Sequence, residues 1–577
     1  MLSFKDLKRS AAGEPSGLPA LRIALLGDTA TQFLATAIKG TGMRRGFHVD
    51  LFEADFNQVE RQLLDPSSDL YRFAPEYVIV FQSTHKLAVK HALMPESGRA
   101  SLADECLGFV ASVCNGPLMA GRKVIWFNFP EIEDTVYGSY ANSVESSLTY
   151  QVRRLNCGLM DLSRRFPDLF ICDIAGLQNK FGRDFMFSPN IYVSTEMVLS
   201  LDSLPYVASR VMDIVCAARG MIRKCVILDL DGTLWGGVIG DDGIEGIQIG
   251  HNLGIGKAFS EFQLWLKKLK ERGIILCVVS KNDEKVAREA FEKHPDMVLR
   301  MEDIAVFIAN WETKVDNIRT VREILNIGFD SMVFLDDNPF ERNMVRENIP
   351  GITVPELPED PGEYLEFLYS LNLFETVSVS REDAGRTEQY RTEAARVSFS
   401  KTFTDEDDYL KSLGMVSEVS GFTKFNTARV AQLSQRSNQF NLRTVRYSEG
   451  DVAAIAADPD AYGLAFTLSD RFGDNGLVAV AVLRRMDGET LFIENWFMSC
   501  RVLKRGMETF TLDQIVSVAK DAGYSRIVGE YVRSSRNAMV EDHYPSLGFV
   551  CMDDGCGARY ALDVAAYQPR SRNIKRK

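Results

Sequence analysis

Apolar runs bounded by polar turns recur along the chain and predict the strands of parallel sheets. Before residue 218, helical stretches separate four such runs, at 21–26, 77–81, 123–128 and 169–174. Strands that alternate with helices in this way are typical of an α/β fold with a parallel sheet. The pattern therefore predicts an α/β domain over residues 1–218.

Three further apolar runs lie beyond residue 220, and each of them ends in polar residues. The runs cover 226–228, 273–279 and 332–335. The residues that follow them are, in order, Asp229 and Asp231, Ser280, and Asp336 and Asp337. Because ligands bind at the carboxyl ends of the strands in an open α/β sheet, we expect these side chains to share one site.

Each of these segments also has an ordinary explanation when it is taken alone. An Asp-x-Asp-Gly segment is often a turn or a helix N-cap, and an Asp-Asp pair is often a turn. A single lysine such as Lys314, which starts a helical pattern, is usually a solvated charge. Four such segments in order, three of them at strand ends, favour a site for phosphoryl transfer.

The succession resembles the four motifs of the haloacid dehalogenase superfamily. Asp229-Leu-Asp231-Gly-Thr is similar to the first motif, Ser280 to the second, Lys314 to the third, and Asp336-Asp337 to the fourth. The resemblance implies a phosphatase that forms an aspartyl phosphate. In that chemistry Asp229 attacks phosphorus, and Asp231 protonates the leaving oxygen and then activates water.

The same resemblance implies a magnesium site. Its candidate ligands are Asp229, Asp231, Asp336 and Asp337, since Mg²⁺ prefers carboxylate and water oxygens. Ser280 and Lys314 would orient and neutralise the phosphoryl oxygens. The sequence leaves open whether Asp336 or Asp337 is the main ligand.

Length and composition narrow the class of protein. The 577 residues are enough for about three or four domains of about 150 residues. A net charge of −13 argues against nucleic acid as the main partner. We find no apolar run of the ~18 residues that a membrane span needs and no signal-peptide core. Ten scattered cysteines without paired spacing favour reduced thiols and a cytoplasmic location.

We predict three domains joined by a helical linker. The predicted ranges are an α/β domain at 1–218, a haloacid-dehalogenase-like domain at 221–375, a linker at 376–399, an α+β domain at 400–567 and a basic tail at 568–577. The tail is expected to be solvated and disordered. Between the first two phosphatase motifs, Asp241-Asp-Gly243 indicates a hairpin flap, and hence a small cap over the site.

The first domain resembles the SGNH hydrolases, whose Gly-Asp-Ser block supplies a nucleophile. Here Gly27-Asp28-Thr29 follows the first strand, so a threonine replaces that serine. The block that should contain Asp-x-x-His is missing, because the corresponding stretch at 187–195 contains no histidine. A Ser/His mechanism needs its base. We therefore expect an SGNH-like (flavodoxin-like) fold without hydrolase activity, with docking of a partner or substrate and a purely structural role both open.

The last domain resembles GNAT acyltransferases. A predicted strand at 490–498 precedes Ser499-Cys-Arg, and the candidate cofactor-binding residues that follow are Arg501, Lys504, Arg505 and Gly506. In the GNAT family, backbone amides of this loop cradle a pyrophosphate at a helix N-terminus. Lys504 stands where the first glycine of the loop is expected, and its side chain is in conflict with acetyl-CoA binding.

Cys500 is the second candidate nucleophile. The start of a helix and neighbouring cations both favour a thiolate, and a thiolate can carry an acyl group. The alternative is a buried structural cysteine. His543 is the candidate base for Cys500, and Tyr544 is either a general acid or a packing residue.

The order of domains and several segments together resemble the FkbH-like family, subfamily IIIC of the haloacid dehalogenase superfamily. The segments are 228–237, 280–282, 334–342, 438–442 and 499–501. The resemblance implies Mg²⁺-dependent loading of a glyceryl unit from 1,3-bisphosphoglycerate onto the phosphopantetheine arm of an acyl carrier protein, in polyketide, tetronate and related biosynthesis. A Cys500 thioester would form, and the Asp229 site would remove the remaining phosphate, in an order that the sequence leaves open.

Two rival functions remain open from the sequence. The protein could be a stand-alone phosphatase of a small metabolite or sugar phosphate. It could also be a GNAT-type acyltransferase in polysaccharide tailoring, although Lys504 argues against that activity.

Overall fold

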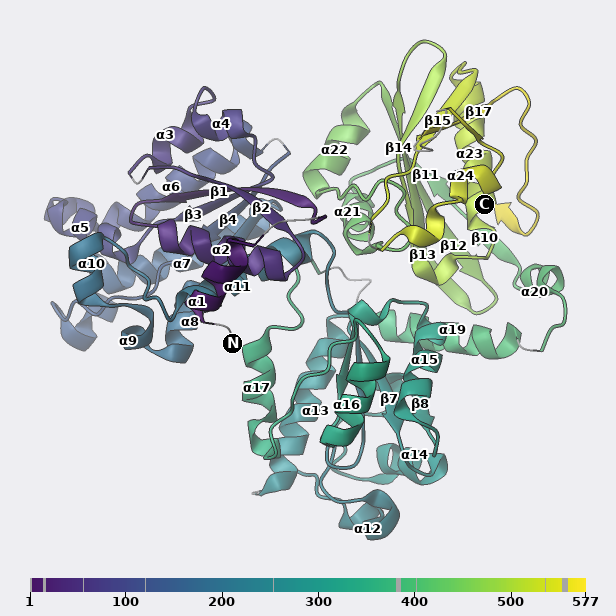
Figure 1. Cartoon of the computed structure of the whole chain (residues 1–577), viewed down its shortest axis with the longest axis horizontal. Helices are drawn as coiled ribbons and strands as arrows, with labels where there is room; N and C mark the ends of the chain where they lie inside the picture. Colours follow the sequence, from purple (N-terminus) through teal and green to yellow (C-terminus); the bar gives the residue numbers. More distant parts are fainter. Residues whose placement is uncertain are drawn as a thin grey trace. The chain divides into compact units, whose positions relative to one another are not determined.

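The computed structural model describes residues 3–13, 17–55, 57–119, 121–252, 254–379, 385–400, 402–534, 536–552 and 559–577. The chain divides into two compact units, Met1–Ala218 and Arg219–Lys577. The helices and strands of both units are labelled in Figure 1. We describe each unit by itself.

The first unit is built on a five-stranded parallel sheet with the order β2-β1-β3-β4-β5. Its strands are β1 (Ala20–Gly27), β2 (His48–Glu53), β3 (Tyr77–Phe81), β4 (Lys123–Phe127) and β5 (Leu169–Cys172). This order is that of flavodoxin-like folds. All five residues of β3, the central strand, are buried, as expected for a strand covered on both faces.

Helices connect these strands and cover the sheet (Figure 1). They are α1 (Phe4–Ala11), α2 (Gln32–Arg44), α3 (Val59–Leu64), α4 (Asp69–Phe73), α5 (Thr84–Leu93), α6 (Leu102–Cys114), α7 (Leu148–Arg165), α8 (Ile174–Phe181), α9 (Arg183–Met186), α10 (Pro189–Thr195) and α11 (Leu204–Ala218). Helix α11 contacts α2, and twelve of its fifteen residues are buried. It therefore completes the core of the first unit.

The second unit begins with a four-stranded parallel sheet in the order β8-β7-β6-β9. The strands are β6 (Cys225–Leu228), β7 (Ile275–Ser280), β8 (Ile304–Ala309) and β9 (Met332–Leu335). All residues of β6, β7 and β9 are buried between two apolar clusters. Parallel sheets in both units confirm the α/β class.

Helices flank this sheet, and one of them corrects an expectation. They are α12 (Ile239–Gly246), α13 (Ile255–Glu271), α14 (Glu284–Lys293), α15 (Lys314–Leu325), α16 (Pro339–Asn348) and α17 (Tyr364–Leu371). The hairpin flap expected at Asp241–Gly243 is wrong, because this segment is helix α12, interrupted at Gly243 by a φ of 69°. At the start of α12, the Val238 N–H donates a hydrogen bond to the Asp242 carboxylate at 2.8 Å.

The rest of the second unit holds a nine-stranded mixed sheet. The strands are β10 (Met415–Ser417), β11 (Val419–Ser420), β12 (Ala461–Asp470), β13 (Gly473–Arg485), β14 (Thr490–Met498), β15 (Arg526–Glu530), β16 (Val550–Cys551), β17 (Arg559–Asp563) and β18 (Ile574–Arg576). Their order is β16-β17-β15-β14-β13-β12-β10-β18, and β11 also pairs with β12. Pairs β14–β15 and β10–β18 are parallel, and the other pairs are antiparallel.

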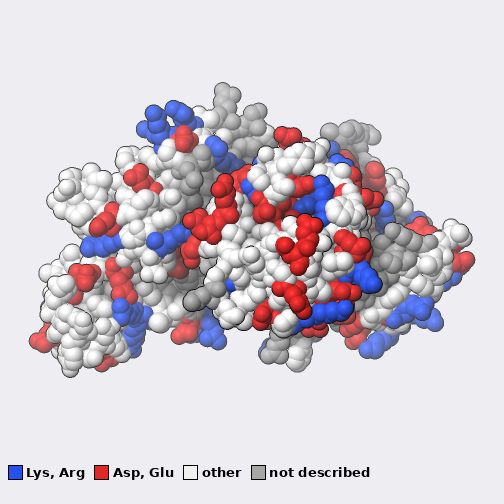
Figure 2. Space-filling model, turned by 90° about the horizontal axis from the view of Figure 1, so that it is seen from below, with Lys and Arg blue, Asp and Glu red and all other residues white. Residues whose placement is uncertain are grey.

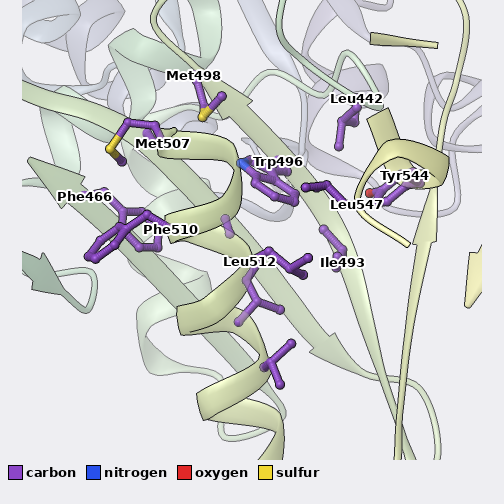
Figure 3. Close-up of a cluster of buried hydrophobic side chains, with 14 of the residues drawn as sticks. Leu442, Phe466, Ile493, Trp496, Met498, Met507, Phe510, Leu512, Tyr544 and Leu547 are labelled. Atoms are coloured by element: carbon purple, nitrogen blue, oxygen red, sulfur yellow. The ribbon is translucent and has the colours of Figure 1, made fainter. Parts of the chain in front are cut away.

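One face of this sheet is covered by α23 (Met507–Asp521) and α24 (His543–Ser546). Figure 3 shows side chains from α23, from β14 and from the segment around Tyr544 meeting in one cluster. Trp496 is fully buried at the centre of that cluster. The remaining helices of this part are α20 (Glu406–Ser412), α21 (Thr427–Arg436) and α22 (Glu449–Ala457).

The chain end contradicts the expectation of a disordered basic tail. Residues Ile574–Arg576 form β18, which pairs in parallel with β10. Ile574 is buried against the core, and the Lys577 ammonium lies 3.2 Å from Glu418. The basic side chains point to solvent while the backbone completes the sheet, so local charge does not decide the structure here.

Helix α19 (Arg386–Ser400) lies between the two sheets of the second unit. It contacts β7, β8 and α15 of the four-stranded sheet. On its other side Glu393 and Arg396 form a buried ion cluster with Arg505 and Asp470 of the mixed sheet. Residues 380–384 of the predicted linker lie outside the described residues. The predicted domain boundaries within the second unit stay predictions.

On the face that Figure 2 shows, acidic side chains gather near the centre, and basic side chains lie in smaller groups between and around them. In the part of the chain that the structure describes, no helix is both long and apolar enough to cross a membrane.

Candidate functional site

Two aspartates stand side by side at the carboxyl edge of the four-stranded sheet. Strands β6 and β9 pair in register, with Leu228 opposite Leu335, so Asp229 and Asp336 are the next residues on adjacent strands. The Asp229 N–H donates to the Leu335 carbonyl at 3.0 Å, which continues the ladder into the site. Both aspartates are buried, with exposed fractions of 7% and 0%.

Lys314 lies between these two carboxylates. Its Nζ is 2.8 Å from Asp229 Oδ2 and 2.5 Å from Asp336 Oδ2. Thr313 caps α15 by accepting the Asp316 N–H, which places Lys314 at the first position of the helix. Burial lowers the pKa of Lys314, but the charges and hydrogen bonds of Asp229 and Asp336 raise it by more, so the pKa lies above its usual value. The ammonium therefore remains charged in a buried site.

Asp337 is the third carboxylate of the site. Its backbone N–H donates to Thr233 Oγ1 at 3.1 Å, and that hydroxyl donates to Asp337 Oδ1 at 3.3 Å. Gly232 turns the chain with a φ of 73°, and a Cβ at this glycine would lie 2.4 Å from Asp337 Oδ2. The glycine is thus required both for the turn and for the close approach of the carboxylate.

The three carboxylates fit a divalent cation. One oxygen of each of Asp229, Asp336 and Asp337 lies within 4.8 Å of the others. Asp229 Oδ1 is buried and has no hydrogen-bond partner among the described residues. Burial, and then the charge of Asp229, raise the pKa of Asp336 to about 7, and the same causes raise that of Asp337. A hard cation at this cluster would satisfy the orphaned oxygen and offset the repulsion.

Asp231 does not join this cluster, so the structure does not place its carboxylate among the candidate metal ligands. The loop after Gly232 folds back over it instead, and Trp235 Nε1 and the Ile239 N–H donate to Oδ1 at 2.8 and 3.0 Å. Asn282 Nδ2 donates to Oδ2 at 2.9 Å. Three donors thus fix this carboxylate in a position suited to proton transfer.

Ser280 ends β7 beside these residues. Its Oγ accepts a hydrogen bond from Asn282 Nδ2 at 3.1 Å, so one amide links Ser280 to Asp231. Sequence reasoning assigned no role to Asn282 or to Arg342. Arg342 is buried, and its Nη1 donates to the carbonyl oxygens of Asp336 and Asp337 at 2.8 and 2.7 Å. Both residues lie in the segments 280–282 and 334–342, which already carried the family resemblance.

Cys500 lies in a different place, on the wall of a cavity of about 400 Å³. It begins a short 3-10 helix (Cys500–Val502), and its carbonyl accepts a hydrogen bond from Asn326 Nδ2 at 2.6 Å. Its side chain is half-buried against the apolar cluster under the four-stranded sheet. The wall is formed by residues that lie beside the four-stranded sheet, such as Lys224 and Ser331, and by residues of the part that holds the mixed sheet, such as Met498.

The cavity and Asp229 lie at opposite edges of the four-stranded sheet. Lys224 and Ser331 line the cavity and directly precede β6 and β9, whereas Asp229 and Asp336 directly follow them. Five residues of extended chain from Lys224 to Asp229 span about 16 Å. The Cys500 side chain therefore lies at the edge of the sheet opposite to Asp229.

The four candidate cofactor-binding residues do not gather around a common ligand position. Arg501 lines the cavity, donates through Nε to Ser499 Oγ at 3.3 Å, and contacts Gln389 of α19. Arg505 is buried in the ion cluster with Glu393 and Asp470. Lys504 is exposed with a φ of 62°, the backbone conformation that favours glycine, and Gly506 has a φ of 82° before α23. The loop backbone at Lys504 has a conformation typical of glycine. The Arg505 side chain is buried in ion pairs with Glu393 and Asp470 and does not point toward a ligand position.

His543 is not placed to serve Cys500 as a base. Its ring packs between Phe440, Trp496 and Tyr544, in the core of the mixed sheet, and its Nε2 has no hydrogen-bond partner among the described residues. Burial lowers the pKa of His543 to about 3. Tyr544 is also fully buried, and its ring stacks on Tyr560. These contacts are those of a packed core.

The segment Gly27-Asp28-Thr29, which resembles the nucleophile block of SGNH hydrolases, is also inaccessible to a substrate. Asp28 accepts the Ser83 N–H on both carboxylate oxygens at 2.9 and 3.0 Å, and burial raises its pKa to about 6. Thr29 is fully buried, and its hydroxyl has no hydrogen-bond partner among the described residues. A fully buried hydroxyl at this position is consistent with the expected loss of hydrolase activity, which stays a prediction.

Comparisons with known proteins agree with this geometry. Residues 22–216 match the family described as FkbH, N-terminal domain. The N-terminal part of the protein BF1531 from Bacteroides fragilis, which contains a phosphatase domain and was crystallised with Mg, is 60% identical to this chain. The match covers 66% of this chain and 100% of that one, with a TM-score of 0.64. The chain belongs to the FkbH-like family. No curated protein matches this FkbH-like chain.

Solved acetyltransferase structures are more remote. The ribosomal-protein-S18-alanine N-acetyltransferase from Escherichia coli is 18% identical over 26% of this FkbH-like chain and 94% of its own, with a TM-score of 0.20. The GNAT domain of PAT from S. lividans is 18% identical over 25% of this chain and 89% of its own, with a TM-score of 0.20. A TM-score this low carries no argument about acyltransferase activity.

Proposed function

We propose that this protein is a magnesium-dependent phosphatase that acts through an aspartyl phosphate and also loads a glyceryl group onto an acyl carrier protein. The phosphatase half is carried by one observation, the cluster of Asp229, Asp336 and Asp337 around the buried Lys314. Membership of the FkbH-like family and the thiol of Cys500 in a separate cavity support the transferase half.

Asp229 would act as the nucleophile of the phosphatase. Lys314 holds its Oδ2, while Oδ1 is left without a hydrogen bond from the described residues. Mg²⁺, when bound by the three carboxylates, would neutralise the phosphoryl oxygens. Lys314 adds a second positive charge to the site, and Ser280 Oγ can donate to a phosphoryl oxygen. Most of the catalysis is therefore electrostatic.

Asp231 would move the protons of both half-reactions. Trp235, Ile239 and Asn282 fix its carboxylate, so it keeps one position while the phosphoryl group is transferred. It gives a proton to the leaving oxygen as Asp229 attacks phosphorus. It then takes a proton from the water that hydrolyses the aspartyl phosphate.

The transfer half uses Cys500 and 1,3-bisphosphoglycerate. The thiol loses its proton to solvent, and the thiolate attacks the carbonyl carbon of the acyl phosphate. The C–S bond forms, the C–O bond to phosphate breaks, and inorganic phosphate leaves with the electron pair. The thiol of a phosphopantetheine arm then attacks the thioester carbon, and the Cys500 thiolate leaves. The Asp229 site hydrolyses the remaining phosphate ester.

Intact mass spectrometry tests this function. The protein is mixed with Mg²⁺, 1,3-bisphosphoglycerate made in situ and a phosphopantetheinylated carrier protein. We expect a glyceryl adduct on the carrier with the wild type, a phosphoglyceryl adduct with Asp229→Asn, and no adduct with Cys500→Ala. Cys551→Ala, at an exposed cysteine, is the matched control and should load normally. Free phosphate with no adduct on enzyme or carrier would instead indicate a stand-alone phosphatase.

A further inference from the structure

The cavity beside Cys500 has an apolar part in its wall. Its volume of about 400 Å³ is in the range of small-molecule sites. Cys500 belongs to the wall, together with a set of apolar and aromatic side chains: Ile327, Tyr390, Leu433, Phe440 and Met498. Such a surface favours a ligand with apolar segments, because these segments leave water when the ligand binds.

The cationic side chains that line the cavity each have a partner within the protein. The Lys224 ammonium donates to the Arg436 carbonyl at 2.6 Å, and Arg536 Nη2 lies 3.0 Å from Asp330 Oδ2. The other three arginines donate to a side chain or to a carbonyl, in the pairs Arg429–Gln432, Arg436–Ser378 and Arg501–Ser499. These charges are therefore part of the fold, and they do not by themselves define a ligand.

Two buried polar atoms of residues in the wall have no hydrogen-bond partner among the described residues. They are Ser437 Oγ, in a residue that is 6% exposed, and Gln439 Oε1. Buried polar atoms are normally hydrogen-bonded, so two orphaned ones in the same wall call for a ligand or water. The amide oxygen of Gln439 can only accept, so its partner must carry an N–H or O–H group, whereas the Ser437 hydroxyl can donate or accept.

We propose that this cavity binds a pantetheine chain and that Gln439 and Ser437 are its hydrogen-bonding residues. An ionised phosphate or carboxylate has no hydrogen to give to Gln439 Oε1, whereas an amide has both an N–H and a carbonyl. Pantetheine joins two amides through methylene groups, carries no charge and ends in a thiol. It therefore matches the orphaned acceptor, the apolar part of the wall and the neighbouring thiol of Cys500.

This placement brings the thiol of the chain to Cys500. It rests on the proposed function for the acyl group that Cys500 carries and for the transfer of that group to the arm. One amide N–H of the chain would donate to Gln439 Oε1, and Ser437 Oγ would donate to an amide carbonyl. The methylene groups would lie against apolar side chains such as Phe440 and Met498. Both polar residues hold the arm, and neither takes part in the bonds that form and break.

Protection of Cys500 from alkylation tests the site without any turnover. The full chain in EDTA is treated with iodoacetamide, and the labelling of each cysteine is followed by peptide mass spectrometry. The probe is the methyl thioether of pantetheine, which keeps both amides and has no thiol to react. We expect it to slow labelling of Cys500 at least fivefold, whereas methylthioethanol, which lacks the amides, should not. The exposed Cys157 is the internal control, and its rate should not change.

Two variants and a matched control localise the chain. Gln439→Leu and Ser437→Ala should each raise the probe concentration for half-protection by about fivefold, as expected for one neutral hydrogen bond. Gln514→Leu should leave protection unchanged, because Gln514 accepts a hydrogen bond from Arg576 at 2.9 Å and does not line the cavity. Gln439→Leu should also leave the urea dependence of labelling at the buried Cys277 unchanged, which separates lost binding from unfolding. If Cys500 does not react with iodoacetamide, calorimetric titration with the thioether should show a binding step that Gln439→Leu weakens and Gln514→Leu keeps.

The source of the pantetheine is decided in the same assay, since both a carrier protein and coenzyme A contain it. With their thiols methylated, the carrier should protect Cys500 at a lower concentration than coenzyme A; the reverse order would keep the pantetheine site and overturn the proposed transfer to a carrier. If 3-phosphoglycerate protects Cys500 and the pantetheine thioether does not, the cavity binds the acyl donor instead and our assignment is wrong. If the thioether gives neither protection nor a calorimetric binding step, the cavity is not a pantetheine site. If the thioether protects but no carrier is loaded, the site stands and the proposed transferase function falls.

Discussion

The substitution Lys314→Met tests whether one buried ammonium holds the phosphatase site together. Methionine keeps much of the length and volume of the lysine stem but removes the charge. Lys314 is 3% exposed and contacts the carboxylates of Asp229 and Asp336 at 2.8 and 2.5 Å, and these two residues are 7% and 0% exposed. Removing one partner of a buried ion pair typically costs about 3–5 kcal/mol, because the other charge is left buried and uncompensated.

The control Lys281→Met changes a pair of the same length in a different environment. Lys281 Nζ lies 2.5 Å from Glu341, but its side chain is 40% exposed. Such a half-exposed pair contributes about 1 kcal/mol or less, since water screens the Lys281 ammonium even though the Glu341 side chain is 10% exposed. Comparison of the two variants therefore separates the effect of burial from the effect of distance.

The free energy of unfolding is measured in EDTA from the urea dependence of alkylation at Cys277, which is buried in β7. We expect Lys314→Met to lose about 3–5 kcal/mol and Lys281→Met less than about 1 kcal/mol. Equal losses in the two variants, with unchanged urea dependence, would refute the reasoning. In that case the carboxylates of Asp229 and Asp336 would have to be compensated by something other than Lys314.

Three further predictions concern single residues. Gly232→Ala should weaken Mg²⁺ binding in calorimetry at least tenfold, since its Cβ would lie 2.4 Å from Asp337 Oδ2; unchanged affinity would contradict the role of this turn. Asp28→Asn should stabilise the first unit at pH 7 by up to about 3 kcal/mol. Burial raises the pKa of Asp28 in the folded protein from 3.8 to about 6. The wild type therefore loses stability as the pH rises from 3.8 to about 6, and its stability stays level above that. Urea-dependent labelling of the buried Cys172 at pH 4 and pH 7 checks this. Lys504→Gly, which relieves a φ of 62°, should stabilise the second unit by up to about 1 kcal/mol in urea, and a loss would show that the lysine side chain matters more than the backbone.

The strands predicted from sequence were those with long buried runs. Tyr77–Phe81, Met332–Leu335 and Thr490–Met498 have the predicted bounds. Strand β2 was missed because five of its six residues are partly or fully exposed, so its sequence carries no continuous apolar run. Strand β18 was missed because its pairing with a distant strand, rather than its own residues, determines its conformation.

The phosphatase residues could be predicted because strand order determines their position. The sequence places Asp229 and Asp336 after two predicted parallel strands, whose carboxyl ends share one edge of the sheet, and the structure shows that these strands are adjacent. The carboxylate of Asp231 could not be placed, since its direction depends on the turn at Gly232 and on hydrogen bonds from Trp235 and Asn282. His543 was predicted from residue type, whereas its burial follows from packing against Trp496, which lies in another strand.

The short strand β6 has a further consequence, because its length sets the distance between the cavity beside Cys500 and the Asp229 site. Its four residues fix the distance from Lys224 to Asp229 at about 16 Å, and neither end can move without breaking the sheet. If the two chemistries proceed as proposed, a substrate visits both sites only when it is tethered to an arm long enough to pass around the sheet. The protein then selects substrates by reach as well as by shape, and a small free thioester that reacts well at one edge is not channelled to the other.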